Sequence, residues 1–113
     1  SGLGARICKL LAEQGIEPPT IKELAEATCS SEKDLRDHLA VLTREGRVTR
    51  VSGDIFYDSG VLKALEEKLI AHLRAKSEII PAEFRELTGL SRKFMIPLLE
   101  YFDSRKVTIR VGD

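Results

Sequence analysis

The chain has little of what catalytic and metal sites are made from. Its 113 residues contain no tryptophan, one methionine, two cysteines and two histidines. Cys8 and Cys29 have neither CxxC nor zinc-ligand spacing, so we interpret both as packing residues and expect no metal. His38 and His72 fall on predicted helices with no nucleophile or second ligand placed beside them. With no phosphate-binding glycine motif either, we predict a protein that is not an enzyme and has no cofactor.

The chain also lacks a long hydrophobic run and a net charge. No apolar stretch approaches the roughly 20 residues that cross a bilayer, and no signal peptide is visible. We therefore expect a cytoplasmic protein, a monomer without membrane contacts. Lysine plus arginine and aspartate plus glutamate each number 18, so the overall field attracts no long nucleic acid. A local basic patch remains compatible with this balance.

An internal repeat is the most informative feature that is present. "KELAEATCSSEKDLRDHLAVLTREGRVTRVSGD" aligns with "AEFRELTGLSRKFMIPLLEYFDSRKVTIRVGD" at an offset of about sixty residues. Buried-type positions keep their apolar character in the alignment. The following residues of the first copy have identical partners in the second: Glu23, Glu26, Thr28, Ser31, Lys33 and Leu39 match Glu83, Glu86, Thr88, Ser91, Lys93 and Leu99. We predict two copies of one module, at residues 1–58 and 59–113.

Helix signals in the first copy predict three helices and a hairpin. Apolar spacing favours a helix from about Leu3 to Gln14. Thr20 with Glu23 forms a capping box, and Ser31 caps a longer helix that ends at Gly46. "VTRV" and "IFY" around "SGD" are typical of a β-hairpin.

The second copy repeats this order. We predict that Ser59 caps its first helix, that Pro81 opens the second, that Ser91 caps the third and that "VTIRV" begins its hairpin. The fold class is therefore mainly α with small β-hairpins (α+β), made of two tandem winged-helix modules, a helix-turn-helix variant.

The two predicted third helices differ in charge at their starts. Glu32 and Asp34 make the first acidic, whereas Arg92 and Lys93 make the second basic. Because a helix N-terminus offers N–H groups to phosphate and arginine adds a bidentate fork, residues 59–113 are predicted to bind nucleic acid. Residues 1–58 are predicted to be an architectural spacer. The candidate contacts are Ser91, Arg92, Lys93, Arg105, Lys106 and Arg110; a solvated basic face is the alternative interpretation.

The last 25 residues resemble a known family. "GLSRKFMIPLLEYFDSRKVTIRVGD" is similar to the last winged-helix module of the bacterial selenocysteine-specific translation elongation factor, SelB. The shared pattern is a serine, Arg-Lys, an aromatic residue, a proline, Leu-Leu-Glu-Tyr and Arg-Val-Gly-Asp. Ile109 departs from it, because wings of the family often carry a second arginine there.

The resemblance implies a function. It implies an RNA-binding fragment that recognises the mRNA hairpin (SECIS) directing UGA recoding to selenocysteine. The parent factor would be a GTPase whose GTP-binding domain is absent here, and it would bring selenocysteinyl-tRNA to the ribosome. By position, the resemblance gives Arg92 the contact with the hairpin tip, beside Lys93, and makes Arg110 and Gly112 secondary candidates.

Two other functions fit the same pattern. A tandem winged-helix transcription regulator would bind duplex DNA, although the neutral charge and the acidic start of the first third helix count against it. A protein-interaction spacer would bind no nucleic acid at all.

Overall fold

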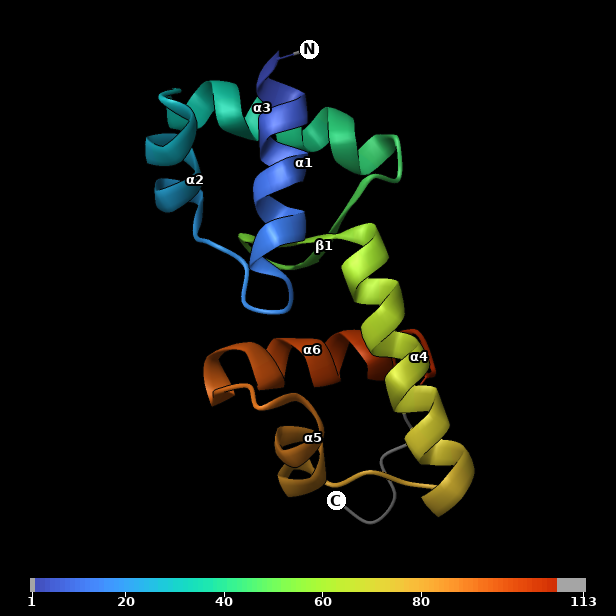
Figure 1. Ribbon diagram of the computed structural model, residues 1–113. Helices are drawn as coiled ribbons and strands as arrows, with labels where there is room; N and C mark the ends of the chain where they lie inside the picture. Colours follow the sequence, from blue (N-terminus) through green and yellow to red (C-terminus); the bar gives the residue numbers. More distant parts are fainter. Residues whose placement is uncertain (1, 108–113) are drawn as a thin grey trace. The chain divides into compact units, whose positions relative to one another are not determined.

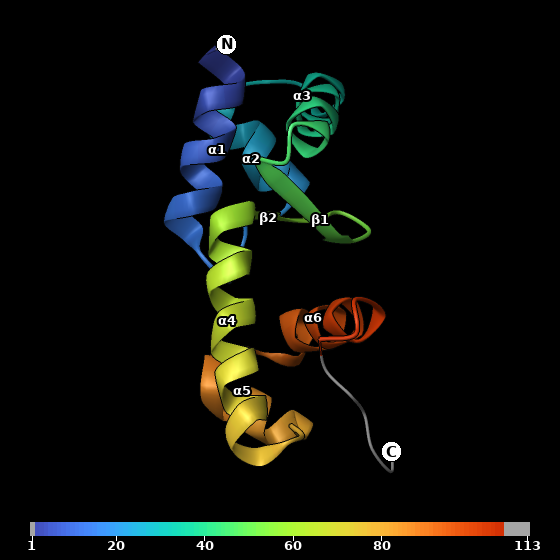
Figure 2. The same cartoon turned by 90° about the vertical axis from the view of Figure 1, so that its right-hand side faces the viewer.

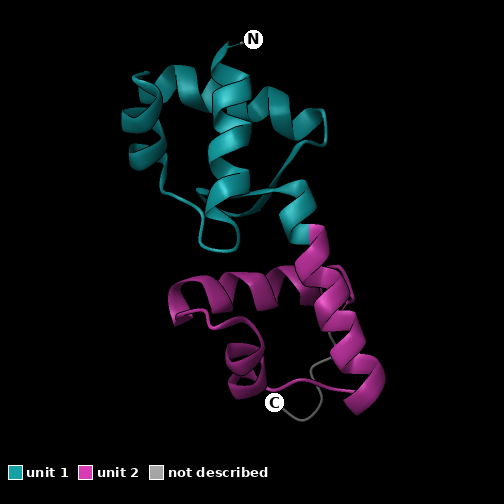
Figure 3. Cartoon of the chain, in the orientation of Figure 1, with its two compact units in different colours: residues 1–62 teal, residues 63–113 magenta. Residues whose placement is uncertain are grey.

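The computed structural model describes residues 2–107 and is mostly helical in that range (Figure 1). Its elements follow in the order α1(Gly2–Gln14), α2(Ile21–Thr28), α3(Glu32–Arg44), β1(Val48–Ser52), β2(Ile55–Asp58), α4(Ser59–Lys76), α5(Pro81–Thr88) and α6(Arg92–Ser104). The chain divides into two compact units, residues 1–62 and residues 63–113 (Figure 3). The boundary falls inside α4.

The first unit is built as the capping signals predicted. The hydroxyl of Thr20 accepts the N–H of Glu23, whose carboxylate accepts the N–H of Thr20, so α2 begins with a complete capping box. Ser31 caps α3 by accepting the N–H of Asp34. These bonds satisfy N–H groups that have no partner inside the helix. The local sequence therefore fixes where both helices start.

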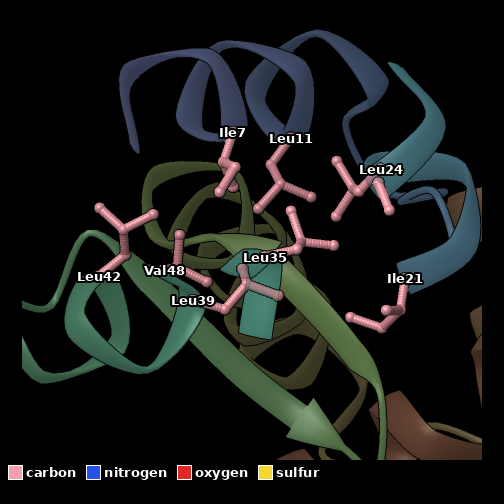
Figure 4. Packing of buried hydrophobic residues seen from close by; sticks show 9 residues of the cluster. Ile7, Leu11, Ile21, Leu24, Leu35, Leu39, Leu42 and Val48 are labelled. Carbon is pink, nitrogen blue, oxygen red and sulfur yellow. The ribbon is translucent and has the colours of Figure 1, made fainter. Parts of the chain in front are cut away.

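A single hydrophobic cluster holds α1, α2, α3 and β1 together. Figure 4 shows Ile7 and Leu11 pointing from α1 toward Leu24, Leu35 and the residues around them. The buried members are Ile7, Leu11, Ile21, Leu24, Ala25, Leu35, Leu39, Leu42 and Val48. Such side chains contribute roughly 1.5–3 kcal/mol each when fully buried, so this cluster is the main stabilising feature of the unit.

The hairpin β1–β2 is antiparallel and closes the unit. Val48 pairs with Asp58 and Arg50 with Phe56, and the register shifts between Arg50 and Ser52. Figure 2 shows β1 leading away from the end of α3 to the hairpin turn. The buried Tyr57 donates its hydroxyl to the carbonyl of Ile16 at 2.9 Å, and burial raises the pKa of this phenol. This bond ties the hairpin to the link between α1 and α2.

The second unit repeats the helical part of this plan. Gly89 follows α5 with φ of 73°, which a glycine adopts without strain. The N–H of Ile80 is accepted by Glu83, and this bond holds the pKa of the carboxyl below its usual range. Its buried apolar residues are Leu65, Leu69, Ile79, Phe84, Leu90, Met95, Leu98, Leu99 and Phe102. Pro97 lies inside α6, and the predicted "VTIRV" hairpin falls mostly outside the described residues.

The structure corrects the predictions for Ser59 and Cys29. Ser59 does not cap α4; the carboxylate of Asp58 accepts the N–H of Val61 at 3.0 Å, and the Ser59 hydroxyl instead bonds Thr49. Cys29 is not a packing residue, because it is exposed and ends α2 in the left-handed conformation with φ of 55°. Cys8 is half-buried and packs against the core, as expected.

Candidate nucleic-acid interface

The start of α6 exposes two basic side chains. Arg92 and Lys93 are its first two residues, and both are exposed. Within residues 2–107, neither side chain forms an ion pair. The ammonium of Lys93 lies 5.2 Å from the centroid of the Phe94 ring, a cation–π contact. The Arg92 guanidinium is therefore free to bind an anion from solution.

Ser91 occupies the N-cap position of α6 but makes no capping hydrogen bond with its side chain. The equivalent serine of α3, Ser31, does make one. The first turn of α6 also contains no acidic residue, in contrast to Glu32 and Asp34 in α3. Since the positive end of the helix dipole attracts anions, α6 offers an N-terminus that no carboxylate of its own first turn neutralises.

Arg105 and Lys106 lie at the opposite end of α6. Arg105 is the C-cap residue, and its guanidinium lies 5.4 Å from the ring centroid of Tyr101. Arg105 lies thirteen positions after Arg92, which is about 20 Å along a helix. The structure therefore does not bring Arg105 and Lys106 together with Arg92 and Lys93. Arg110 and Gly112 lie outside the described residues.

Neither histidine belongs to a catalytic or metal site in the described part of the chain. His38 is half-buried on α3, with Nδ1 2.9 Å from the carbonyl oxygen of Asp34. His72 Nε2 lies 3.7 Å from a carboxylate oxygen of Glu83. Over residues 2–107, no group of three potential metal ligands comes together. No helix in that range is long and apolar enough to cross a membrane.

A second basic cluster, which the sequence analysis missed, lies on the first unit. Arg36, Arg44 and Arg50 line a groove between α3 and the hairpin. The sequence offered one signal, since Arg36 and Arg44 are eight positions apart and so fall on one helix face. Glu32 and Asp34 at the start of α3 mask this cluster in the local charge pattern.

Comparison with known proteins agrees with this architecture. Residues 71–113 match the family model "Elongation factor SelB, winged helix". The selenocysteine-specific elongation factor of Desulfomicrobium baculatum is 34% identical over 113 residues, which is 100% of this chain and 18% of that protein. The Escherichia coli factor is 28% identical over 99 residues, which is 88% of this chain and 16% of that protein. The chain thus spans less than a fifth of the length of these curated relatives.

A solved structure has the same fold. It is the mRNA-binding domain of elongation factor SelB from E. coli in complex with SECIS RNA, with a TM-score of 0.81 and 27% sequence identity. The match covers 97% of this chain and 91% of the solved one. Sequence similarity along the whole chain and a common winged-helix fold lead to one assignment: the chain belongs to the selenocysteine-specific elongation factor (SelB) family, as a segment of its winged-helix region.

Proposed function

We propose that this chain is the mRNA-hairpin-binding part of a selenocysteine-specific elongation factor and that it acts in the cytoplasm. The observation that carries the proposal is the exposed Arg92–Lys93 pair at the start of α6, in a chain whose structural relative is an mRNA-binding domain in complex with SECIS RNA. A-form duplexes hide the edges of their bases, so hairpins are recognised at loops and through the backbone. An arginine fork at a helix start suits both kinds of contact.

The residues of this site have separate roles in the proposal. Arg92 contacts phosphates or a splayed base at the hairpin tip, and the uncapped N–H groups at the start of α6 donate hydrogen bonds to phosphate oxygens of the same strand. Lys93, held over the Phe94 ring, adds positive charge beside it. Arg110 and Gly112 are proposed as further contacts from the wing, and Arg105 and Lys106 as a second point of attraction at the far end of α6.

The two modules have different roles. Residues 59–113 form the RNA-binding winged helix, and residues 1–58 form a first winged helix with an architectural role. The parent protein is proposed to be a GTPase that brings selenocysteinyl-tRNA to the ribosome. Tethering that tRNA to the messenger raises its concentration near the recoded codon, as linked binding does in general. The chain itself acts as a monomer, without chemistry or a cofactor.

Binding to a panel of RNA stem-loops tests the proposal. The stem-loops are taken from messenger downstream of in-frame UGA codons, and the titration follows fluorescence anisotropy. Arg92→Ala is expected to weaken binding of the recognised stem-loop by roughly 1–3 kcal/mol. The matched control is Arg74→Ala, an exposed arginine in the last turn of α4, which should have little effect.

Two results would contradict the proposal. Equal losses in the Arg92 and Arg74 variants would show that charge alone, and not the start of α6, determines affinity. Tighter binding to duplex DNA than to every stem-loop would favour a transcription regulator, a function that none of the relatives described above has.

A further inference from the structure

A pocket of about 430 Å³ lies in the first unit between the start of α1 and the second half of α3, two helices that cross in Figure 1. The small residues Gly4 and Ala5 line it on the α1 side. Val41 and Leu42 line it on the α3 side. Val41 is 41% exposed, although an aliphatic side chain gains free energy when it is buried. The α1–α3 pocket therefore offers an apolar surface that the described chain leaves open to solvent.

The charges around this pocket favour a cation over a phosphate. Two carboxylates, Asp37 and Glu45, stand against one guanidinium, Arg47, so the lining has a net charge of −1 when its histidine is neutral. Glu45 is the exposed C-cap residue of α3, where the negative end of the helix dipole adds to its charge. Lys33 pairs with Asp37 at 3.0 Å, whereas Glu45 forms no ion pair within residues 2–107.

The second unit has different chemistry at the matching positions of α6. At the offset of sixty residues, Val41 and Glu45 correspond to Tyr101 and Arg105. Tyr101 is half-buried, and the guanidinium of Arg105 lies 5.4 Å from the centroid of its ring. The second copy thus supplies from its own chain an aromatic ring and a cation. The first copy has a smaller aliphatic side chain and an unpaired carboxylate instead, so it lacks both bulk and positive charge at this place.

We propose that the α1–α3 pocket docks a basic amphipathic helix of another protein. The helix inserts a leucine or an aromatic side chain between Ala5 and Val41 and places a lysine or arginine on Glu45. Proteins recognise such helices in apolar grooves through anchors spaced at i and i+4. The charge pair at the rim fixes the orientation of the helix, and Arg47 offers donors to a carboxylate on the same partner.

This contact is independent of hairpin recognition at the start of α6, because every residue of the pocket belongs to the first unit. It gives the first module a protein partner of its own, beyond an architectural role. Nucleic acid does not suit the pocket, since a phosphate would meet the carboxylates of Asp37 and Glu45.

The experiment titrates the whole 113-residue chain, labelled with ¹⁵N, and follows its amide signals by NMR. The probe is a stapled helical peptide of about 14 residues with leucine and lysine at i and i+4 on one face, stapled because so short a helix is marginal in water. A second peptide has glutamate in place of every lysine. We expect the lysine peptide to shift the amide signals of residues 37–47 and to bind roughly tenfold more tightly than the glutamate peptide.

Two variants and a matched control locate the contact. Glu45→Lys reverses the charge that receives the lysine, and Val41→Ser removes the apolar contact; each should weaken binding of the lysine peptide roughly tenfold. Glu26→Lys makes the same charge change at an exposed residue of α2, outside the pocket, and should alter the affinity by no more than about twofold.

Several outcomes would overturn the proposal: unchanged affinity in both pocket variants, an equal loss in Glu26→Lys, equal binding of the glutamate peptide, or no shift among residues 37–47. Displacement of the peptide by an RNA stem-loop would overturn the assignment to a protein partner. Failure of peptide binding, with the effect of Arg92→Ala on stem-loops intact, would refute this inference and leave the proposed function standing.

Discussion

The third helices of the two units have the same backbone plan and opposite charge patterns. Helix α3 is acidic at its start and basic farther along, at Arg36 and Arg44, whereas α6 is basic at its start. Their buried positions are conserved between the copies, as the identical pair Leu39 and Leu99 shows. A few surface residues therefore decide which end of the helix attracts an anion, while the core determines the fold.

Among the tests of this difference between α3 and α6, reversal of the charge at the start of α6 should have the largest effect. Arg92→Glu/Lys93→Glu gives α6 an acidic start like that of α3, and carboxylates there repel phosphate. We expect the affinity for the recognised stem-loop to fall at least about a hundredfold, measured by anisotropy. The same reversal at Lys9 and Lys22 of the first unit should leave most of that affinity intact. A comparable loss in both double variants would mean that the two helix starts do not differ in function.

The ends of the two helices differ in a second way. Gly46 follows α3 with φ of 79°, and the equivalent Lys106 follows α6 with φ of 61°. Left-handed backbone costs a residue with a side chain about 1–2 kcal/mol. Gly46→Ala should therefore destabilise the chain by about 1 kcal/mol, although its new Cβ would meet no atom within 4 Å. Lys106→Gly should stabilise it by a similar amount.

Urea unfolding followed by circular dichroism measures both changes. If Gly46→Ala lowers the free energy of unfolding and Lys106→Gly raises it, the left-handed residue after each helix is the cause of the difference between the helix ends. Destabilisation by Lys106→Gly would contradict it, because relief of backbone strain would then not be the dominant effect.

The smallest expected difference concerns the N-cap serines. Ser31→Ala removes a hydroxyl that accepts the N–H of Asp34, so it should cost about 1 kcal/mol of unfolding free energy. Ser91→Ala should cost no more than a few tenths, because the Ser91 hydroxyl makes no capping hydrogen bond. Chemical denaturation of the two variants side by side provides the measurement, and equal costs would show that Ser91 caps α6 in solution.

Local signals allowed much of the fold to be predicted from sequence. The capping box of Thr20 and Glu23, the opening of α5 at Pro81 and the hairpin turn depend on neighbouring residues, and all three are confirmed. The helix start at Ser59 was wrong in its cap, because Asp58 lies one residue earlier and its carboxylate is the stronger acceptor. Two adjacent capping residues leave a choice that the chain resolves only on folding.

The candidate site was less predictable because it depends on distant residues. The pairing of Arg36 with Asp54 joins residues 18 positions apart on different elements, and no local pattern indicates it. Arg92 and Arg105 are close in sequence, yet they lie at opposite ends of α6. Exposed charges follow no periodicity of burial, so their grouping becomes visible only when the elements are placed.

The hydrogen bond from Tyr57 to Ile16 also sets an order for biosynthesis. It joins residues 41 positions apart, and the β2 strand that carries it is the last strand of its unit. As the nascent chain emerges, α1, α2 and α3 are already available to collapse around their leucines. The unit nevertheless cannot form this hydrogen bond until Tyr57 has left the exit tunnel, so the hairpin is fastened only after all three helices of the unit have emerged.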